Sequence, residues 1–139
     1  MKNYILVLLA ILVASCDPDI NKFTLTVKNS SSKPVRFKAI RQYQPNSAPN
    51  IINLNAGEEL SKFFADRGPG THYNFQEFFE GDKLTIIYNN DKYITFIFGT
   101  FEGNSNNPFN LAIYNGREQV YVVKDEYFAN AIPCDANCD

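Results

Sequence analysis

The side chains best suited to acid–base chemistry are the one histidine of the chain and a run of carboxylates that follows it. These residues are His72, Glu77, Glu80 and Asp82. A Ser-His-Asp triad needs a nucleophile beside the histidine, and the sequence contains no G-x-S-x-G elbow. A glycosidase needs two carboxyl groups about 5 to 9.5 Å apart across one bond, which proximity in sequence does not provide. A solvated loop explains these residues better, so we predict no catalytic residues.

Metal-binding chemistry has few ligands in this chain. One histidine and two neighbouring cysteines do not complete a four-ligand zinc site. Oxygen-bearing side chains alternate in Glu102-Gly103-Asn104-Ser105-Asn106, and Ca²⁺ takes six to eight oxygens. The glycine and the terminal glutamate of an EF-hand loop are missing, so an asparagine-rich loop is the simpler interpretation. We predict no metal and no cofactor, with a calcium loop as the alternative.

Aromatic rings near the long loops are the candidates for ligand binding. They are Tyr73, Phe75, Phe78, Phe79 and Phe101. Rings held at one end of a fold can stack on sugars or on partner side chains, because aromatics bring a large contact area at low entropic cost. We take Tyr73, Phe75 and Phe101 as the candidate ligand contacts. The simpler interpretation is that these rings cover the core, and the absence of tryptophan counts against sugar binding.

Cys16 is placed for a different chemistry, covalent lipidation. An apolar block from Ile5 to Ala14 follows the basic Lys2, and about ten helical residues span roughly half of a ~30 Å hydrocarbon core. That length suits a signal peptide better than a membrane span. The block ends in Val13-Ala14-Ser15-Cys16, which resembles the lipobox of bacterial lipoproteins. A buried N-terminal strand or helix, the alternative, leaves the abrupt change of composition after Cys16 unexplained.

The lipobox resemblance implies how the chain is processed and where it lies. Residues 1–15 are then a cleaved signal peptide, and residues 16–21 are a lipidated start and short tether. The acyl chains on Cys16, palmitate among them, exceed the two hydrophobic signals that stable anchoring needs. Five residues after Cys16 reach at most about 17 Å, so we expect the domain close to the lipid surface.

The residues after Cys16 bear on which membrane carries the protein. Asp17 resembles an inner-membrane retention signal of enteric bacteria, whereas acids at this place resemble a surface-export signal in Bacteroidota. The Asn-, Lys-, Tyr- and Phe-rich composition is similar to that of the second group. We therefore expect an envelope lipoprotein of the outer membrane, on its periplasmic or surface face, rather than of the inner membrane.

Cys134 and Cys138 are the two remaining cysteines. A disulfide is the default in an exported protein, and this spacing permits one only if the segment curls to bring the Cα atoms within about 7 Å. A redox motif would be C-x-x-C rather than C-x-x-x-C, and free thiols are the other alternative. We predict a structural disulfide that fixes the C-terminal tail.

Composition and patterning indicate one all-β domain over residues 22–139. The chain of 139 residues is 45% hydrophobic with a formal net charge of −2, and its charges are interspersed, which argues against nucleic-acid binding. Apolar–polar alternation predicts short strands about ten residues apart, hence a single antiparallel sandwich of seven or eight strands. A small closed barrel is the alternative. The expected strands cover residues 22–28, 35–39, 51–54, 60–64, 83–88, 92–98, 111–114 and 119–123.

Three hairpins and one short helix are expected among these elements. The first hairpin joins residues 22–28 to 35–39, and the second joins 83–88 to 92–98 through Asn89-Asn90-Asp91. The third joins residues 111–114 to 119–123. Residues 125–131 are expected to form one or two helical turns, capped by Asp125.

From Phe23 to Cys134 the layout resembles small Bacteroidota lipoproteins with an immunoglobulin-like sandwich. The shared motifs are Asn55-Ala56-Gly57-Glu58, Phe79-Glu80-Gly81-Asp82-Lys83-Leu84-Thr85-Ile86, Pro108-Phe109-Asn110-Leu111, Lys124-Asp125-Glu126-Tyr127 and Ala131-Ile132-Pro133-Cys134. This resemblance implies a fold and a location, and no activity.

The sequence therefore predicts an anchored, non-enzymatic binding or accessory module. Its attachment is to membrane lipid through the acylated Cys16, and its loops are expected to contact a protein or glycan partner. The alternative is a protease inhibitor or a small hydrolase that uses the loops at residues 65–82 or 99–110.

Overall fold

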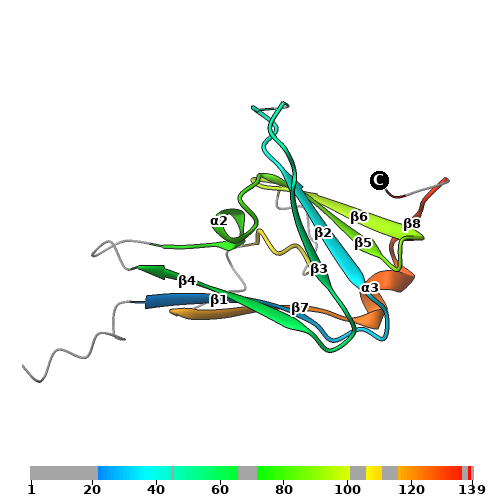
Figure 1. Ribbon diagram of the computed structural model, residues 1–139, viewed down its shortest axis with the longest axis horizontal. Helices are drawn as coiled ribbons and strands as arrows, with labels where there is room; N and C mark the ends of the chain where they lie inside the picture. Colours follow the sequence, from blue (N-terminus) through cyan, green and yellow to red (C-terminus); the bar gives the residue numbers. More distant parts are fainter. Residues whose placement is uncertain are drawn as a thin grey trace, which may run out of the picture.

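The computed structural model describes residues 22–44, 46–65, 72–100, 106–110, 116–135 and 138, which form a sandwich of two β-sheets (Figure 1). The smaller sheet has the strand order β4-β1-β7, and the larger has the order β3-β2-β5-β6-β8. The predicted all-β sandwich is confirmed. The alternative of a closed barrel is wrong, because the described strands form two separate sheets.

The elements of the described residues follow one another along the chain in a simple order. They are β1 (Lys22–Asn29), β2 (Val35–Ile40), β3 (Asn50–Leu54), β4 (Glu59–Ala65), α2 (Phe75–Phe79), β5 (Lys83–Tyr88), β6 (Lys92–Ile97), β7 (Glu118–Val123), α3 (Asp125–Ala129) and β8 (Ile132–Pro133).

The order of β1 to β6 is that of an immunoglobulin-type sandwich. Taken as strands B, C, C′, E, F and G, they give one sheet with E beside B and another with the order C′-C-F-G. The C-terminal β7 takes the place of strand A beside β1, but it runs parallel to β1. The expectation of a wholly antiparallel fold is therefore wrong at this pair.

The hairpin predicted between residues 83–88 and 92–98 is confirmed. β5 and β6 pair antiparallel with Tyr88 opposite Lys92. Asn89 and Asn90, in the turn between them, have φ angles of 47° and 59°. Two left-handed residues in succession are typical of the type I′ turn, which asparagine tolerates better than most residues.

The hairpin predicted between residues 22–28 and 35–39 is wrong, because β1 and β2 lie in different sheets. The corner between them is organised by Asn29, which has no exposed surface. Its Nδ2 donates to the carbonyl oxygens of Lys33, Leu54 and Asn55 at 2.8 to 3.1 Å. Its Oδ1 accepts from the backbone and the hydroxyl of Ser31. A buried amide satisfied on both sides thus turns the chain from one layer to the other.

The last predicted hairpin is only partly within the described residues. Residues 111–115 lie outside them, and β7 pairs with β1. The predicted short helix is present as α3, but its N-cap is Lys124 rather than Asp125. The carboxylate of Asp125 instead accepts hydrogen bonds from the backbone N–H and the hydroxyl of Ser32, at 2.8 and 3.0 Å. The predicted cap is therefore wrong, and Asp125 ties α3 to the β1–β2 corner.

The core lies between the two sheets and includes one face of α2. Alternate residues of β1, β2 and β5 point inward and are buried, whereas most of their neighbours are half-buried on the outer faces; Ile87 of β5 is buried as well. In Figure 1, α2 lies between the two layers, and its three phenylalanines are completely buried. Among the described residues, no helix has the length and apolar character needed to cross a membrane.

Candidate functional site

The aromatic residues predicted to contact a ligand are core residues where the structure describes them. Phe75 has no exposed surface and Tyr73 is 9% exposed. The Tyr73 hydroxyl donates to the Ala65 carbonyl at 2.7 Å, and its ring stacks on Phe64 with centroids 4.8 Å apart. These buried rings cover the core, which was the simpler interpretation. Phe101 and the lipidation residue Cys16 lie outside the described residues.

A capping box explains why the aromatic stretch is a helix rather than a loop. The Asn74 side chain accepts from the Gln76 backbone N–H at 2.7 Å, and the Glu77 carboxylate accepts from the Asn74 backbone N–H at 2.9 Å. These reciprocal bonds satisfy donors at the helix start. The turn that they begin directs Phe75, Phe78 and Phe79 inward. The Asn-x-x-Glu spacing was the sequence signal for this helix.

The carboxylates near His72 meet in a surface depression beside α2, which we call the helix hollow. Its volume is about 540 Å³, and its lining residues are Arg41, Tyr43, Gln44, Gln76, Glu77, Glu80, Gly81 and Asp82. Asp82 accepts from the backbone N–H of Gln42 at 2.8 Å, and Glu77 is engaged in the capping box. These carboxylates hold backbone groups in place, so the hollow offers no paired acid and base.

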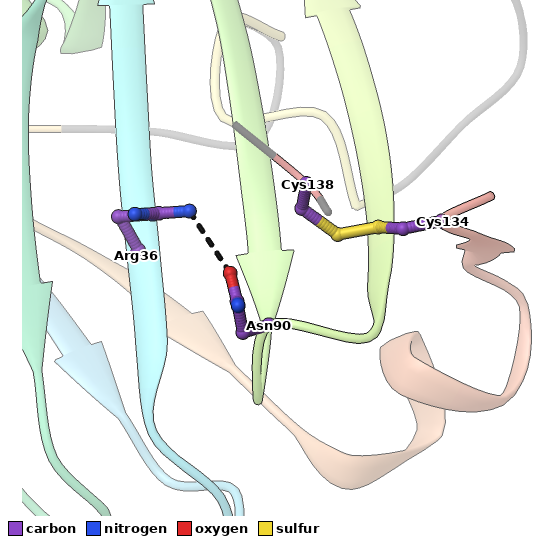
Figure 2. Close-up of a disulfide and its surroundings, with 4 residues drawn as sticks. All are labelled: Arg36, Asn90, Cys134 and Cys138. Atoms are coloured by element: carbon purple, nitrogen blue, oxygen red, sulfur yellow. Dashed lines mark hydrogen bonds between the residues drawn. A yellow bond between two sulfur atoms is a disulfide. The ribbon is translucent and has the colours of Figure 1, made fainter. Parts of the chain in front are cut away.

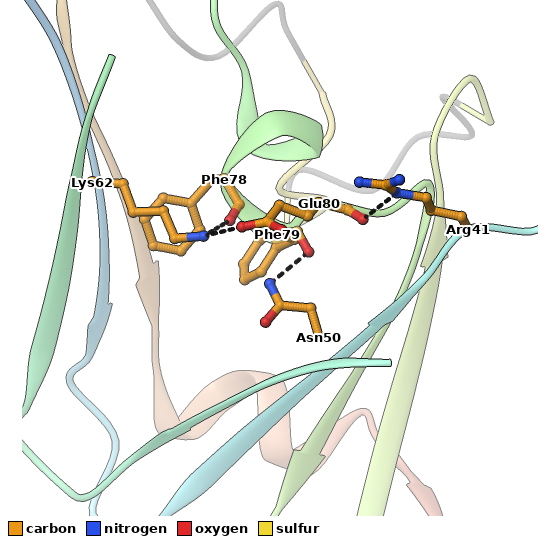
Figure 3. A network of polar contacts seen from close by, with 6 residues as sticks. All are labelled: Arg41, Asn50, Lys62, Phe78, Phe79 and Glu80. Atoms are coloured by element: carbon orange, nitrogen blue, oxygen red, sulfur yellow. Dashed lines mark hydrogen bonds and ion pairs between the residues drawn. The ribbon is translucent and has the colours of Figure 1, made fainter. Parts of the chain in front are cut away.

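Glu80 is engaged at the end of α2 in the network of Figure 3. Lys62 Nζ donates to its carboxylate at 2.9 Å and to the Phe78 carbonyl at 2.7 Å, and lies 5.2 Å from the Phe78 ring centroid. Arg41 donates to the Glu80 carbonyl at 3.1 Å, and Asn50 donates to the Phe79 carbonyl at 2.9 Å. The bond from Lys62 lowers the pKa of Glu80.

A histidine, a metal cluster and a buried tyrosine are the other groups that could take part in catalysis. His72 is exposed, and no cluster of three or more His, Cys, Asp or Glu residues suited to a metal occurs in the described part of the chain. The Tyr88 hydroxyl is buried without a hydrogen-bond partner among the described residues, next to a cavity of about 200 Å³. Burial raises its pKa, so this phenol stays protonated and suits an ordered water better than acid–base chemistry.

The C-terminal tail begins at the edge of the larger sheet, beside β6, and carries a disulfide (Figure 2). Cys134 and Cys138 are bonded, with Cα atoms 5.4 Å apart, as the sequence predicted. The tail is held at its start, where β8 pairs with β6. The Cys134 N–H also donates to the Asp91 carbonyl at 2.9 Å. The disulfide thus closes a loop that is already fixed to the β5–β6 hairpin.

Between this tail and the sheet lies a depression of about 550 Å³, which we call the tail groove. Its floor consists of outward-facing side chains from three adjacent strands, β2, β5 and β6, and its wall is the tail. The lining residues are Lys38, Ile40, Lys83, Thr85, Tyr93, Thr95, Ile132, Pro133, Cys134, Asp135 and Cys138.

Strand register brings two lysines together in the tail groove. Lys38 lies opposite Thr85 in the β2–β5 pair, while Lys83 is two residues away from Thr85 on β5. Diagonal neighbours of this kind are about 7–8 Å apart, so the ends of two lysine side chains can approach one another. Thr85 in turn lies opposite Thr95, with the hydroxyl oxygens 3.2 Å apart. The floor therefore places two ammonium groups around a pair of hydroxyls.

The charged groups of the tail groove have no protein partners in the described part of the chain. Within it, the side chains of Lys38 and Lys83 make no hydrogen bond or ion pair, and neither does the Tyr93 hydroxyl. Asp135 is the one carboxylate among the described lining residues. Arg36, on the same face of β2, is instead bonded to Asn90 at 3.0 Å (Figure 2). The groove therefore carries uncompensated positive charge on a chain whose formal net charge is −2.

Comparison of the chain with models of known protein families, with curated proteins and with solved structures finds no match. The candidate site is therefore defined by its geometry. Of its residues, the sequence analysis singled out only the cysteine pair. Lys38, Lys83 and Tyr93 were missed, because the pairing of β2 with β5 joins residues far apart in the sequence.

Proposed function

We propose that this protein is a lipid-anchored, non-enzymatic binding module of the bacterial envelope, and that the tail groove is its binding surface. One observation carries the choice of surface: the groove presents the ammonium groups of Lys38 and Lys83 and the hydroxyl of Tyr93, which have no partner among the described residues. Ligand sites combine a concave volume of about 300–1,000 Å³ with a few polar groups, and the groove, a depression of about 550 Å³ with polar lining residues, has both.

The proposed anchor is compatible with an accessible groove. The lipobox resemblance places the acyl chains on Cys16, and β1 begins at Lys22. β1 is the central strand of the smaller sheet, whereas the groove lies on the outer face of the larger sheet. The tether therefore enters the domain through the layer that does not carry the groove, which supports a site open to a glycan or protein partner.

The anchor is tested by Cys16→Ala in a bacterial host. We expect unprocessed precursor without acyl chains, because the acceptor sulfur is gone. Palmitate labelling and mass spectrometry of the membrane fraction measure both properties. Cys134→Ser with Cys138→Ser is the matched control, since it removes the two disulfide cysteines without touching the lipobox. Normal palmitate labelling of the Cys16→Ala variant would contradict the proposal.

The binding surface is tested by filling the groove. Thr85→Trp places a large ring at the centre of the floor, whereas Tyr43→Ala removes an exposed ring (93% exposed) from the helix hollow. The detergent-solubilised lipoprotein and both variants are applied to a panel of immobilised glycans. We expect Thr85→Trp to abolish binding and Tyr43→Ala to leave it unchanged. The reverse pattern would move the site to the helix hollow.

A further inference from the structure

The charge and hydroxyl content of the tail groove specify a class of ligand. Resting on the proposed function, we propose that the groove binds an anionic sugar, one that carries a carboxylate or a phosphate. Its anionic group would lie between the ammonium groups of Lys38 and Lys83, and its ring would lie against the tail.

The two lysines are the first part of the argument. Each ammonium has three donors on a flexible stem, and their diagonal placement on β2 and β5 lets both reach one oxyanion. Because neither has a partner among the described residues, an anionic ligand would compete with no internal ion pair. The opposing Asp135 leaves a net positive charge on the described lining.

The remaining lining suits a sugar ring. The Thr85, Thr95 and Tyr93 hydroxyls can donate to or accept from ligand hydroxyls. Ile40, Ile132 and Pro133 give apolar surface for the C–H groups of the ring. The disulfide between Cys134 and Cys138 holds the wall in place before binding, which lowers the cost of ordering the site.

The position of the floor argues against a peptide ligand. Extended peptides commonly bind by adding a strand to a sheet edge, where backbone groups are unpaired. The floor strands β2 and β5 each have a neighbour on both sides, and β8 pairs with β6 at Lys92 and Tyr93. Recognition on this sheet face uses side chains, which favours a compact polyol with one charged group.

The test is binding of defined probes to the detergent-solubilised lipoprotein by isothermal titration calorimetry. The anionic probes are galacturonate, glucuronate and glucose 6-phosphate, and the matched neutral probes are galactose and glucose. We expect at least one anionic probe to bind at least tenfold more tightly than its neutral counterpart, and more weakly as salt is raised. A comparison of the affinities for the two uronates and for glucose 6-phosphate shows whether the groove prefers a carboxylate or a phosphate.

Double variants of Lys38 and Lys83 separate the effect of their charge from the effect of their shape. Lys38→Met with Lys83→Met should lower affinity for the anionic probe at least tenfold, whereas the double arginine variant should retain most of it. The control is Lys28→Met with Lys124→Met, which removes two lysines whose partners are Glu59 and Glu126. The groove variants should keep the wild-type unfolding midpoint in urea, and the control variant, which loses two exposed ion pairs, should lower it only slightly.

Three outcomes would overturn the inference. In the first, neutral sugars bind as tightly as anionic ones, and their binding is lost in Thr85→Trp but not in the double methionine variant. This result would support the groove as the binding surface but contradict its preference for an anionic sugar. Tight binding of a triglutamate peptide without binding of any anionic sugar would replace the sugar by an acidic peptide. Absence of binding by every anionic probe at millimolar concentration would also refute it.

Discussion

The helix hollow and the tail groove have nearly the same volume, about 540 and about 550 Å³, but they use charged residues in opposite ways. In the hollow, Glu77, Glu80 and Asp82 all accept hydrogen bonds that hold backbone or side-chain groups of the fold. In the groove, Lys38 and Lys83 have no such bonds in the described part of the chain. The charged side chains of the helix hollow bind other groups of the fold, whereas the two lysines of the tail groove have no partner among the described residues.

The difference follows from where each set of residues lies in the fold. Helix ends and chain reversals leave backbone N–H and C=O groups unpaired, and nearby polar side chains bind them. The backbone of internal strands is already paired on both sides, so polar side chains at their centres find no backbone partner. Charges at the middle of an exposed sheet face are therefore better ligand-binding candidates than charges beside a short helix.

The largest stability effect is expected in the helix hollow, from Gly81→Ala. A Cβ at residue 81 would lie 2.8 Å from the carbonyl oxygen and 3.0 Å from the backbone nitrogen of Ile40. Backbone cannot retreat as a flexible side chain does, so we expect a loss of about 1–3 kcal/mol in the free energy of unfolding. Urea denaturation measures it. Asn46→Ala, at an exposed position of the neighbouring β2–β3 loop, should change stability by under about 0.5 kcal/mol; equal stability of the two variants would contradict the close approach.

The corresponding test in the tail groove is Cys134→Ser with Cys138→Ser. A loop this short contributes about 2 kcal/mol in the chain-entropy model of a disulfide, and the sheet beneath keeps all its strand pairs. We therefore expect a fold with a native far-ultraviolet circular dichroism spectrum and a stability lowered by about 2 kcal/mol. Treatment of the wild-type protein with reductant should reproduce the loss. Complete unfolding of the variant at room temperature would show that the tail is part of the scaffold after all.

Strand positions were the part of this fold that local sequence could predict. Alternation in Phe23, Leu25 and Val27 gave β1, and Asn89 and Asn90 gave the turn between β5 and β6. Both signals are local, since a strand's faces and a type I′ turn depend only on adjacent residues. The pairing of the strands was harder to predict. The chain passes from one sheet to the other at Asn29, whose side chain donates to carbonyl groups as distant in sequence as that of Asn55.

The candidate site was harder to predict than the strands, for a related reason. Lys38 and Lys83 are neighbours only because β2 pairs with β5, and no local pattern encodes that register. The candidate rings Tyr73 and Phe75 were misleading, since an aromatic stretch looks like a loop until the Asn74–Glu77 capping box is recognised as a helix start. The disulfide between Cys134 and Cys138 was predictable because a disulfide is the default in an exported protein and a curled segment brings the two residues within reach.

The smallest effect on the free energy of unfolding is expected for Glu80→Gln. Its dependence on pH tests directly whether the charge of a carboxylate in the helix hollow stabilises the fold. The hydrogen bond from Lys62, followed by its charge, lowers the pKa of Glu80 from 4.5. A lowered pKa means that the folded state favours the ionised carboxylate. The resulting stabilisation is fully present above pH 4.5 and is lost as pH falls through the lowered pKa.

We therefore expect Glu80→Gln to cost about 0.2–1 kcal/mol at pH 7, the range for ion pairs at exposed positions, because the Glu80 carboxylate is 56% exposed. The difference from wild type should vanish in acid, below the pKa of Glu80, where both side chains are neutral. Urea denaturation from pH 7 to pH 2 gives both curves. Glu59→Gln is the matched control, since its 3.6 Å pair with Lys28 lies outside the hollow. A Glu80→Gln deficit that stays constant into acid would mean that the carboxylate's shape, not its charge, supports α2.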